Sequence, residues 1–174
     1  MKKVCIVGLG LSRINTPYDD KEFEIWGLND SFSILKRCDR LFQIHKLEDI
    51  KDMIGRYNKT NVIEELKSIK IPIYMQQVFD DIPSSVKYPL KEVSNGYHQL
   101  FSCCISYMIA LAIYENFEEI LICGVELAND EEYTNQLPSV LYWLGIAEGK
   151  GIKVIISENC CLLNRIVKLY GYET

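Results

Sequence analysis

Residues 3–13 read KVCIVGLGLSR, and this stretch decides the fold that we expect of the 174-residue chain. It begins with a continuous apolar run rich in β-branched residues, which is typical of a strand buried on both faces. The run ends in two glycines, where the backbone can turn sharply. We therefore predict a first buried strand, followed by a turn whose backbone amides can approach a phosphate.

Apolar runs of similar length recur along the chain, separated by segments with helical spacing. The further strand predictions are FEIWGLN (23–29), RLFQIH (40–45), IPIYM (71–75), EEILICGVE (118–126) and IKVIIS (152–157). The helix predictions are 46–57, 60–70 capped by Thr60 or Asn61, the buried central helix 102–117, 138–151 and 161–170, with a short helix or turn at 30–38 and a long loop at 76–99. This alternation predicts an α/β, Rossmann-like fold, with a mostly parallel sheet covered by helices on both faces. At this length we expect a single nucleotide-binding domain over residues 1–174.

Composition narrows the classes of partner. Lysine and arginine number 19 and aspartate and glutamate 24, so the formal net charge is −5, whereas a duplex nucleic-acid binder needs a basic face. The longest apolar stretch, ISYMIALAIY, is too short to span a membrane, so we expect a cytoplasmic protein. The seven cysteines lack the spacing of a zinc site and are predicted to be reduced and mostly buried.

The turn after the first strand is the first candidate for a ligand site. Gly8 and Gly10 let the backbone approach a phosphate, Ser12 offers a hydroxyl, and Arg13 could add a charged, bidentate contact. The alternative is a tight strand-to-loop turn without a ligand. The third glycine of a dinucleotide-binding fingerprint is absent, because position 13 is arginine.

Polar residues also end the second and third predicted strands. Asn29 and Asp30 could hydrogen-bond a ribose or a base, or could cap the following helical turn. His45 ends the third strand, and His98 lies in the loop before the central helix. Either histidine could act as a general base, a general acid or a phosphate donor, and the alternative for each is a structural role.

Ser102 stands at the start of the predicted central helix, where it would cap the helix and could also contact an anion. A last group of candidates follows the strand predicted at 118–126. Gly124 ends that strand, and Glu126 follows it as a third catalytic candidate. The polar loop beyond is expected to supply residues that line the pocket. This group comprises Gly124, Glu126, Glu132, Tyr133 and Gln136. No spacing of carboxylates typical of a metal site is present, so we predict no metal ligand.

Taken together, the ordered motifs resemble a family of small Rossmann-like proteins of phages and bacteria. The matching segments lie at 8–12, 26–29, 42–45, 102–113, 124–126 and 132–136. The wider set that the chain resembles includes DUF115-type proteins, the archaeal hydroxymethylpterin diphosphokinase group and, more distantly, bacterial sialyltransferases that use a CMP-sugar. The resemblance implies phosphates near Gly8, Gly10 and Ser12 and nucleoside contacts near Asn29. Leu11 replaces the proline that usually precedes the serine, and Glu126 replaces the usual aspartate.

Two nucleotide-dependent functions fit these residues, and a third alternative is a structural accessory protein whose pocket is vestigial. The first is a transferase or hydrolase acting on a nucleotide or a nucleotide-sugar phosphate, in which the first turn would neutralise the leaving group. Diphosphokinase-like chemistry would need magnesium, whereas sialyltransferase-like chemistry would not. The second is a non-catalytic phage protein that sequesters a host nucleotide signal, such as a cyclic dinucleotide or an ADP-ribose derivative, and so counters host defence. The sequence alone does not decide whether there is turnover, and homo-oligomerisation is compatible with a domain of this size.

Overall fold

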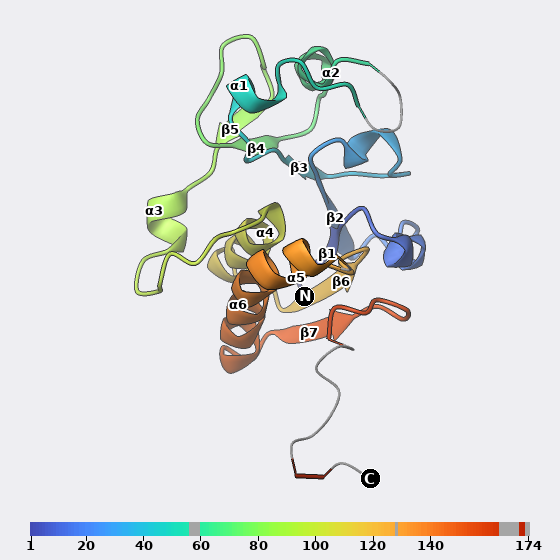
Figure 1. Cartoon of the computed structure of the whole chain (residues 1–174), viewed down its shortest axis with the longest axis vertical. Helices are drawn as coiled ribbons and strands as arrows, with labels where there is room; N and C mark the ends of the chain where they lie inside the picture. The colour runs from blue at the N-terminus through green and yellow to red at the C-terminus, as the bar shows by residue number, and fades with distance from the viewer. Residues whose placement is uncertain (56–59, 128, 164–170, 173–174) are drawn as a thin grey trace.

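A computed structural model describes residues 1–55, 60–127, 129–163 and 171–172. Seven strands form one parallel sheet in the order β5-β4-β3-β2-β1-β6-β7 (Figure 1). The strands are β1 (Lys3–Val7), β2 (Phe23–Leu28), β3 (Arg40–Phe42), β4 (Ile73–Met75), β5 (Ser85–Lys87), β6 (Glu119–Cys123) and β7 (Lys153–Ile156). The α/β, Rossmann-like fold predicted from the apolar runs is confirmed.

The strand that opens the chain lies near the middle of the sheet. Its first residue, Lys3, is in register with Phe23 of β2 on one side and with Glu119 of β6 on the other. Alternate residues of β1 face opposite sides of the sheet, and four of its five residues are fully buried. A strand covered in this way explains why the run is apolar throughout rather than alternating.

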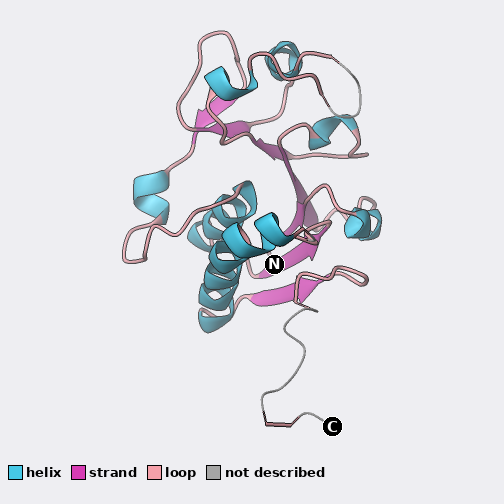
Figure 2. Ribbon diagram, in the orientation of Figure 1, coloured by secondary structure: helices cyan, strands magenta, loops and turns pink. Residues whose placement is uncertain are grey.

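The helices are short except for two. They are α1 (Leu47–Ile50), α2 (Val62–Ser68), α3 (Leu90–Val93), α4 (Cys104–Tyr114), α5 (Asp130–Asn135) and α6 (Leu137–Gly149), with 3₁₀ turns η1 (Leu11–Asn15) and η2 (Ser31–Ser33). The long helices α4 and α6 pack against each other and cover one face of β1, β2, β6 and β7 (Figure 2). Eight of the eleven residues of α4 are buried, so the predicted central buried helix is confirmed.

The opposite face of the sheet is covered in two different ways. Over β3 and β4, helices α1 and α2 bury Ile50, Val62 and Leu66 against the strands. Over β1, β2 and β6, the cover comes instead from the 3₁₀ turns η1 and η2 and the segments that follow them, with Tyr18 and Leu35 packed against the sheet. No helix in the described part of the chain is long and apolar enough to cross a membrane.

Two predicted segments are corrected by the structure. The helix predicted at 46–57 ends at Ile50, because Ile54 forms an antiparallel bridge with Asn61 and the chain turns back. Residues 56–57 of that prediction lie outside the described residues. Asn61 does cap α2, since its side chain accepts hydrogen bonds from two backbone amides of the helix.

The predicted long loop at 76–99 contains the edge strand β5 and the short helix α3. The sequence of β5, SVK, carries no apolar run that would predict a strand, because two of its three residues are exposed, and short edge strands commonly carry a lysine. Residues 164–170, most of the closing helix predicted at 161–170, lie outside the described residues.

All seven cysteines are free thiols.

Candidate functional site

The topology marks one place at the sheet edge where a ligand is expected. From β1 the chain builds the sheet outward to β5, then returns to place β6 on the other side of β1. The carboxyl ends of β1 and β6 therefore form a topological switch point, where ligands bind in open α/β sheets. A cavity of about 490 Å³ lies at this position, which we call the switch-point pocket. It is lined by Gly8, Leu9, Gly10, Leu11, Leu28, Asn29, Ile105, Gly124, Val125, Glu126, Leu127, Glu132 and Gln136.

The first turn is held against the end of β6 by its backbone. The Gly8 N–H donates to the Cys123 carbonyl oxygen at 2.8 Å, and the Gly10 N–H donates to the Gly124 carbonyl oxygen at 2.8 Å. A Cβ at Gly8 would stand 2.1 Å from the Gly124 oxygen. Glycine is therefore required at position 8 by the close approach of two chain segments.

The side chains of Ser12 and Arg13 and the Ser12 N–H already have partners within the protein. The buried Ser12 accepts a hydrogen bond from the Gly124 N–H at its Oγ (2.8 Å), and its own N–H donates to Glu126 Oε1 at 2.8 Å. Arg13 Nη1 donates to the carbonyl oxygens of Leu9 and Gly10 at 3.0 and 2.9 Å. The Glu126 carboxylate therefore accepts from a backbone N–H of the turn that the sequence predicts to bind a phosphate. The Arg13 side chain stabilises the turn.

Glu126 presents an incomplete set of hydrogen bonds. Its Oε2 is buried and has no hydrogen-bond partner in the structure. This oxygen lies directly over Gly10, so that a Cβ at position 10 would stand 1.0 Å from it. A carboxylate oxygen can only accept hydrogen bonds, and leaving a buried acceptor unused costs free energy. A ligand hydroxyl or amino group could donate to Oε2 once the carboxylate rotates away from Gly10 into the pocket that Glu126 lines.

Asn29 borders the switch-point pocket at the end of β2. Its backbone adopts a left-handed conformation (φ 52°), and its side-chain Oδ1 accepts a weak hydrogen bond from Cys104 Sγ at 3.5 Å. Burial raises the pKa of the Cys104 thiol to about 12, so this thiol stays a neutral donor. Asp30 stands at the N-cap position of η2, but its side chain makes no capping hydrogen bond.

The two histidines lie in different surroundings. His45 follows β3 and lines a second cavity of about 250 Å³, the histidine pocket, together with Asn29, Asp30, Gln43, Ile50, Met53, Ile54 and Val62. Asn29 belongs to both pockets, so the two cavities adjoin along the carboxyl edge of the sheet. His98 lines neither pocket. Its backbone N–H donates to the Tyr142 hydroxyl at 3.0 Å, and the two rings are 6.4 Å apart.

Ser102 does not cap the central helix, contrary to the sequence prediction. The chain remains extended through Cys103, which holds the N-cap position without a side-chain hydrogen bond, and α4 begins at Cys104. Ser102 Oγ instead lies 2.6 Å from Ser139 Oγ on α6. Ser102 is not among the residues that line either pocket.

The polar segment after β6 is a helix and not the predicted loop. Asn129 caps α5 by accepting a hydrogen bond from the Glu132 N–H at 2.7 Å. An Asn followed three residues later by Glu is a helix-start pattern that could have identified α5. Glu132 and Gln136 line the switch-point pocket as expected of pocket residues, whereas the side chain of Tyr133 lies outside the described part of the structure.

Sequence reasoning missed two kinds of site residue. The first is apolar: Leu9, Leu28, Ile105, Val125 and Leu127 line the switch-point pocket, and each also reads as a core residue in the sequence. The second is Gln43, whose position two residues before His45 was the available signal, because alternate residues of an extended chain share a face. Among the described residues, no group of three or more histidine, cysteine, aspartate or glutamate side chains could hold a metal ion.

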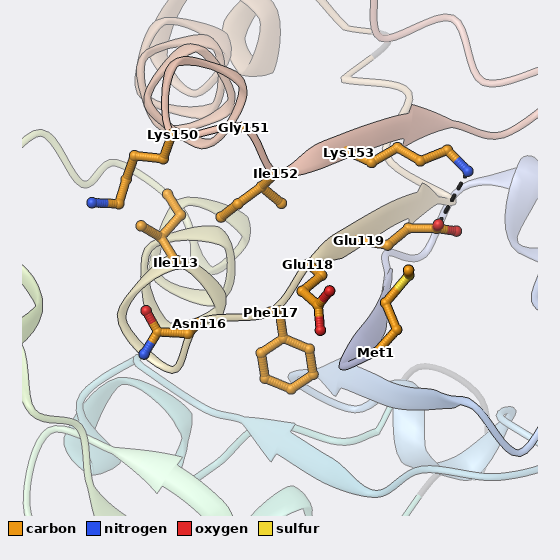
Figure 3. A pocket seen from close by; sticks show the side chains of 10 residues that line it. All are labelled: Met1, Ile113, Asn116, Phe117, Glu118, Glu119, Lys150, Gly151, Ile152 and Lys153. Atoms are coloured by element: carbon orange, nitrogen blue, oxygen red, sulfur yellow. Dashed lines mark hydrogen bonds and ion pairs between the residues drawn. The ribbon is translucent and has the colours of Figure 1, made fainter.

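A further cavity of about 440 Å³ lies at the opposite, amino edge of the sheet, between the end of α4, the start of β6 and the α6–β7 turn (Figure 3). Both of its glutamates and Lys153 have protein partners: Lys153 Nζ lies 3.1 Å from Glu119 Oε2, and Glu118 Oε1 accepts from the Lys2 N–H. We call this the amino-edge pocket. Ligands of parallel sheets bind at the carboxyl ends of the strands, so we do not assign it the function.

No protein-family model matches the sequence, and no curated protein matches it. Solved structures do match. The sialyltransferase CstII from Campylobacter jejuni in complex with cytidine-5'-monophosphate (CMP) is 16% identical at a TM-score of 0.57, over 94% of this chain and 83% of that chain. CstII with a trisaccharide acceptor and CMP is 16% identical at a TM-score of 0.56, over 94% and 84%. An α-2,3-sialyltransferase from Campylobacter jejuni in apo form is 15% identical at a TM-score of 0.57, over 94% and 78%.

These likenesses show the fold. The chain is an α/β protein built like a sialyltransferase, with one parallel sheet and a pocket at its switch point. Of the families that the sequence motifs resemble, the distant one, the sialyltransferases, is therefore supported at the level of fold.

Proposed function

We propose that this protein binds a nucleotide or a nucleotide sugar in the switch-point pocket and acts as a transferase. The observation that carries the proposal is the pocket itself, which lies at the switch point of a fold shared with a sialyltransferase solved in complex with CMP, and which has a buried unused acceptor on Glu126. A nucleotide offers what this acceptor needs, because ribose carries two hydroxyl donors. Apolar side chains of Leu9, Val125 and Leu127 supply the wall for a base or a sugar ring.

Charge decides how the ligand is oriented in this proposal. Two negative charges close together repel strongly at reduced dielectric, so the phosphate lies away from the Glu126 carboxylate while the nucleoside lies beside it. Asn29 lines both this pocket and the histidine pocket, whereas Glu126 lines this pocket only. The Asn29 Oδ1 already accepts from Cys104, which leaves the amide hydrogens to donate to a phosphate oxygen.

The adjoining histidine pocket completes the proposed reaction. An acceptor hydroxyl there attacks the anomeric carbon of the bound nucleotide sugar, forming a new C–O bond while the bond to the phosphate oxygen breaks. The leaving nucleotide phosphate takes the bonding electron pair, and His45 takes the hydroxyl proton as a general base. Asn29 lies between the two half-sites, next to the place where negative charge develops on the leaving phosphate.

The test measures binding first and turnover second. Calorimetric titration with CMP, UMP, AMP and GMP should show saturable binding of at least one nucleotide. The sugar conjugate of the nucleotide that binds is then incubated with the protein, with and without Mg²⁺, and release of free nucleotide is followed by chromatography. The variant His98→Gln is the matched control, because His98 lines neither pocket, and it should keep both activities.

The outcomes separate the candidate functions. Binding with release of nucleotide supports the transferase, or a hydrolase when water replaces the acceptor. Binding without release, and recovery of the intact ligand on heating, would support the sequestering protein instead. Failure of every nucleotide and nucleotide sugar to bind would overturn the proposal.

A further inference from the structure

A buried glutamine and an exposed histidine form a pair directly after β3. Gln43 is 2% exposed, and its backbone N–H donates to the Tyr74 carbonyl oxygen at 2.9 Å, which anchors it to β4. Its side-chain Oε1 lies 2.8 Å from Nδ1 of His45. Both side chains line the histidine pocket beside Asn29.

The chemistry of the two groups sets the position of the imidazole proton. A neutral imidazole has one N–H donor and one nitrogen that accepts, and an amide oxygen can only accept. The contact at Oε1 therefore requires the proton on Nδ1, which leaves the lone pair on Nε2. The hydrogen bond that one ring nitrogen makes determines the role of the other.

We propose that Gln43 is a positioning residue that holds His45 as the Nδ1–H tautomer, so that Nε2 is the nitrogen that receives a proton from the acceptor. The catalytic consequence rests on the proposed function, whereas the tautomer does not. The histidine pocket is then the acceptor side of the site. Its wall of Ile50, Met53 and Val62 fits an acceptor that carries its hydroxyl beside an apolar surface.

The tautomer can be measured without any ligand. Long-range ¹H–¹⁵N spectra of protein labelled in its imidazole rings distinguish a protonated ring nitrogen from an unprotonated one, at a pH where the rings are neutral. The chain has two histidines, so the variant His98→Gln leaves the signals of His45 alone. We expect Nδ1 of His45 to carry the proton in the otherwise unchanged protein.

Two variants of Gln43 sharpen the test. Gln43→Met keeps the length of the side chain but removes the acceptor, and the proton should move to Nε2. Gln43→Glu keeps an acceptor oxygen, and the proton should stay on Nδ1. The proposal is overturned if His45 carries its proton on Nε2 in the parent protein, or if Gln43→Met leaves the ring unchanged. The parent spectrum decides the question even where a variant does not fold.

Kinetics then tests the catalytic consequence separately. If the protein is a transferase, His45→Gln should lower kcat by about a hundredfold or more, the scale of a lost general base. Gln43→Met should lower kcat without changing KM for the nucleotide, and Gln43→Glu should restore part of the rate. If His45 has the expected tautomer but the protein shows no turnover, the proposed function is refuted, whereas the proposal that Gln43 sets the tautomer of His45 is supported. Turnover with an unaffected Gln43→Met rate would refute the role of the pair.

Discussion

Two partly buried charged residues, Arg40 and Glu126, differ in how completely their polar atoms are hydrogen-bonded. Arg40, at the amino end of β3, is enclosed by Glu115 and Glu24 and stacks over the ring of Trp26 at 4.8 Å. Its Nη1 donates to both carboxylate oxygens of Glu115 at 2.7 and 2.8 Å, and its Nε pairs with Glu24 at 2.8 Å. Glu126, at the carboxyl edge, has one satisfied oxygen and one buried oxygen without a partner.

This difference distinguishes a charge with a structural role, at Arg40, from a charge with an unused hydrogen-bond acceptor, at Glu126. Burial opposes the charge of Arg40, but hydrogen bonds and attraction from Glu115 and Glu24 outweigh it and raise the pKa of the guanidinium above its ordinary value. Each nitrogen of the Arg40 guanidinium has a carboxylate partner. Buried polar groups are nearly always satisfied in folded proteins, and an unsatisfied one requires an explanation. For Glu126 we propose that the explanation is a ligand.

The largest effect is expected at Arg40. Arg40→Met removes the cation and leaves two carboxylates facing each other without compensation. The free energy of unfolding should fall by about 3 kcal/mol, the low end for breaking a buried ion pair, because the partners keep 22 and 35% exposure. Urea denaturation measures the loss. Lys67→Met, which breaks only exposed pairs, should leave the denaturation midpoint almost unchanged. Equal effects of the two variants would contradict the structural role of Arg40.

The next effect is expected at Gly10. A methyl group there would collide with Glu126 Oε2, so Gly10→Ala must move the carboxylate and break its bond to the Ser12 N–H. We expect a loss of about 2 kcal/mol in stability, from a charged hydrogen bond and local strain, together with loss of nucleotide binding.

Gly145 on α6 is the matched control for this substitution, because a Cβ there meets nothing within 4 Å. Gly145→Ala should stabilise the protein by about 0.5–1 kcal/mol, as expected of alanine in place of glycine in a helix, and should leave binding unchanged. Normal binding by Gly10→Ala would show that the carboxylate over the turn is not part of the ligand site.

The third prediction concerns Glu126 itself, in the variant Glu126→Gln. The amide oxygen can still accept from the Ser12 N–H, while the buried unpartnered charge is removed. The unfolding free energy should therefore change by no more than about 1 kcal/mol, the difference between a charged and a neutral hydrogen bond. Nucleotide affinity should fall by about tenfold, equivalent to about 1.4 kcal/mol. A variant with lost stability and unchanged affinity would make Glu126 a structural residue like Arg40.

The smallest effect is expected at Ser102. Ser102→Ala removes the contact to Ser139, but Ser139 Oγ keeps a second partner, the Gln136 carbonyl oxygen at 2.9 Å. Stability should fall by about 0.5–1 kcal/mol in thermal or urea denaturation, and the calorimetric affinity for nucleotide should not change. A clear fall in affinity would indicate that Ser102 contacts the ligand after all.

The sequence predicts the sheet well because its central strands are buried on both faces. The continuous runs of β1, β2 and β6 identify those strands, and the all-apolar α4 identifies the helix over them. Pattern alone fails at β5, whose polar sequence pairs on one side only. It also fails at α5, whose acidic and polar sequence is typical of a loop although Asn129 caps a helix there.

The place of the site could be inferred more readily than its contacts. Glycine and polar residues after strands point to the carboxyl edge, and the pockets lie there. The partners of these residues lie far away in the sequence: Ser12 meets Gly124 and Glu126, and Ser102 meets Ser139. Such contacts depend on how the sheet and helices pack, which no local pattern reports.

The most direct test of the central claim is to map CMP onto the protein by ¹H–¹⁵N correlation spectra of the backbone amides. Titration with CMP should shift the amide signals of Gly8, Gly10 and Gly124 in the switch-point pocket, and these shifts should saturate together. The signal of Gly151 in the amino-edge pocket (Figure 3) should stay in place. Shifts centred on Gly151, or no shift at saturating CMP, would show that the switch-point pocket is not the binding site for this nucleotide.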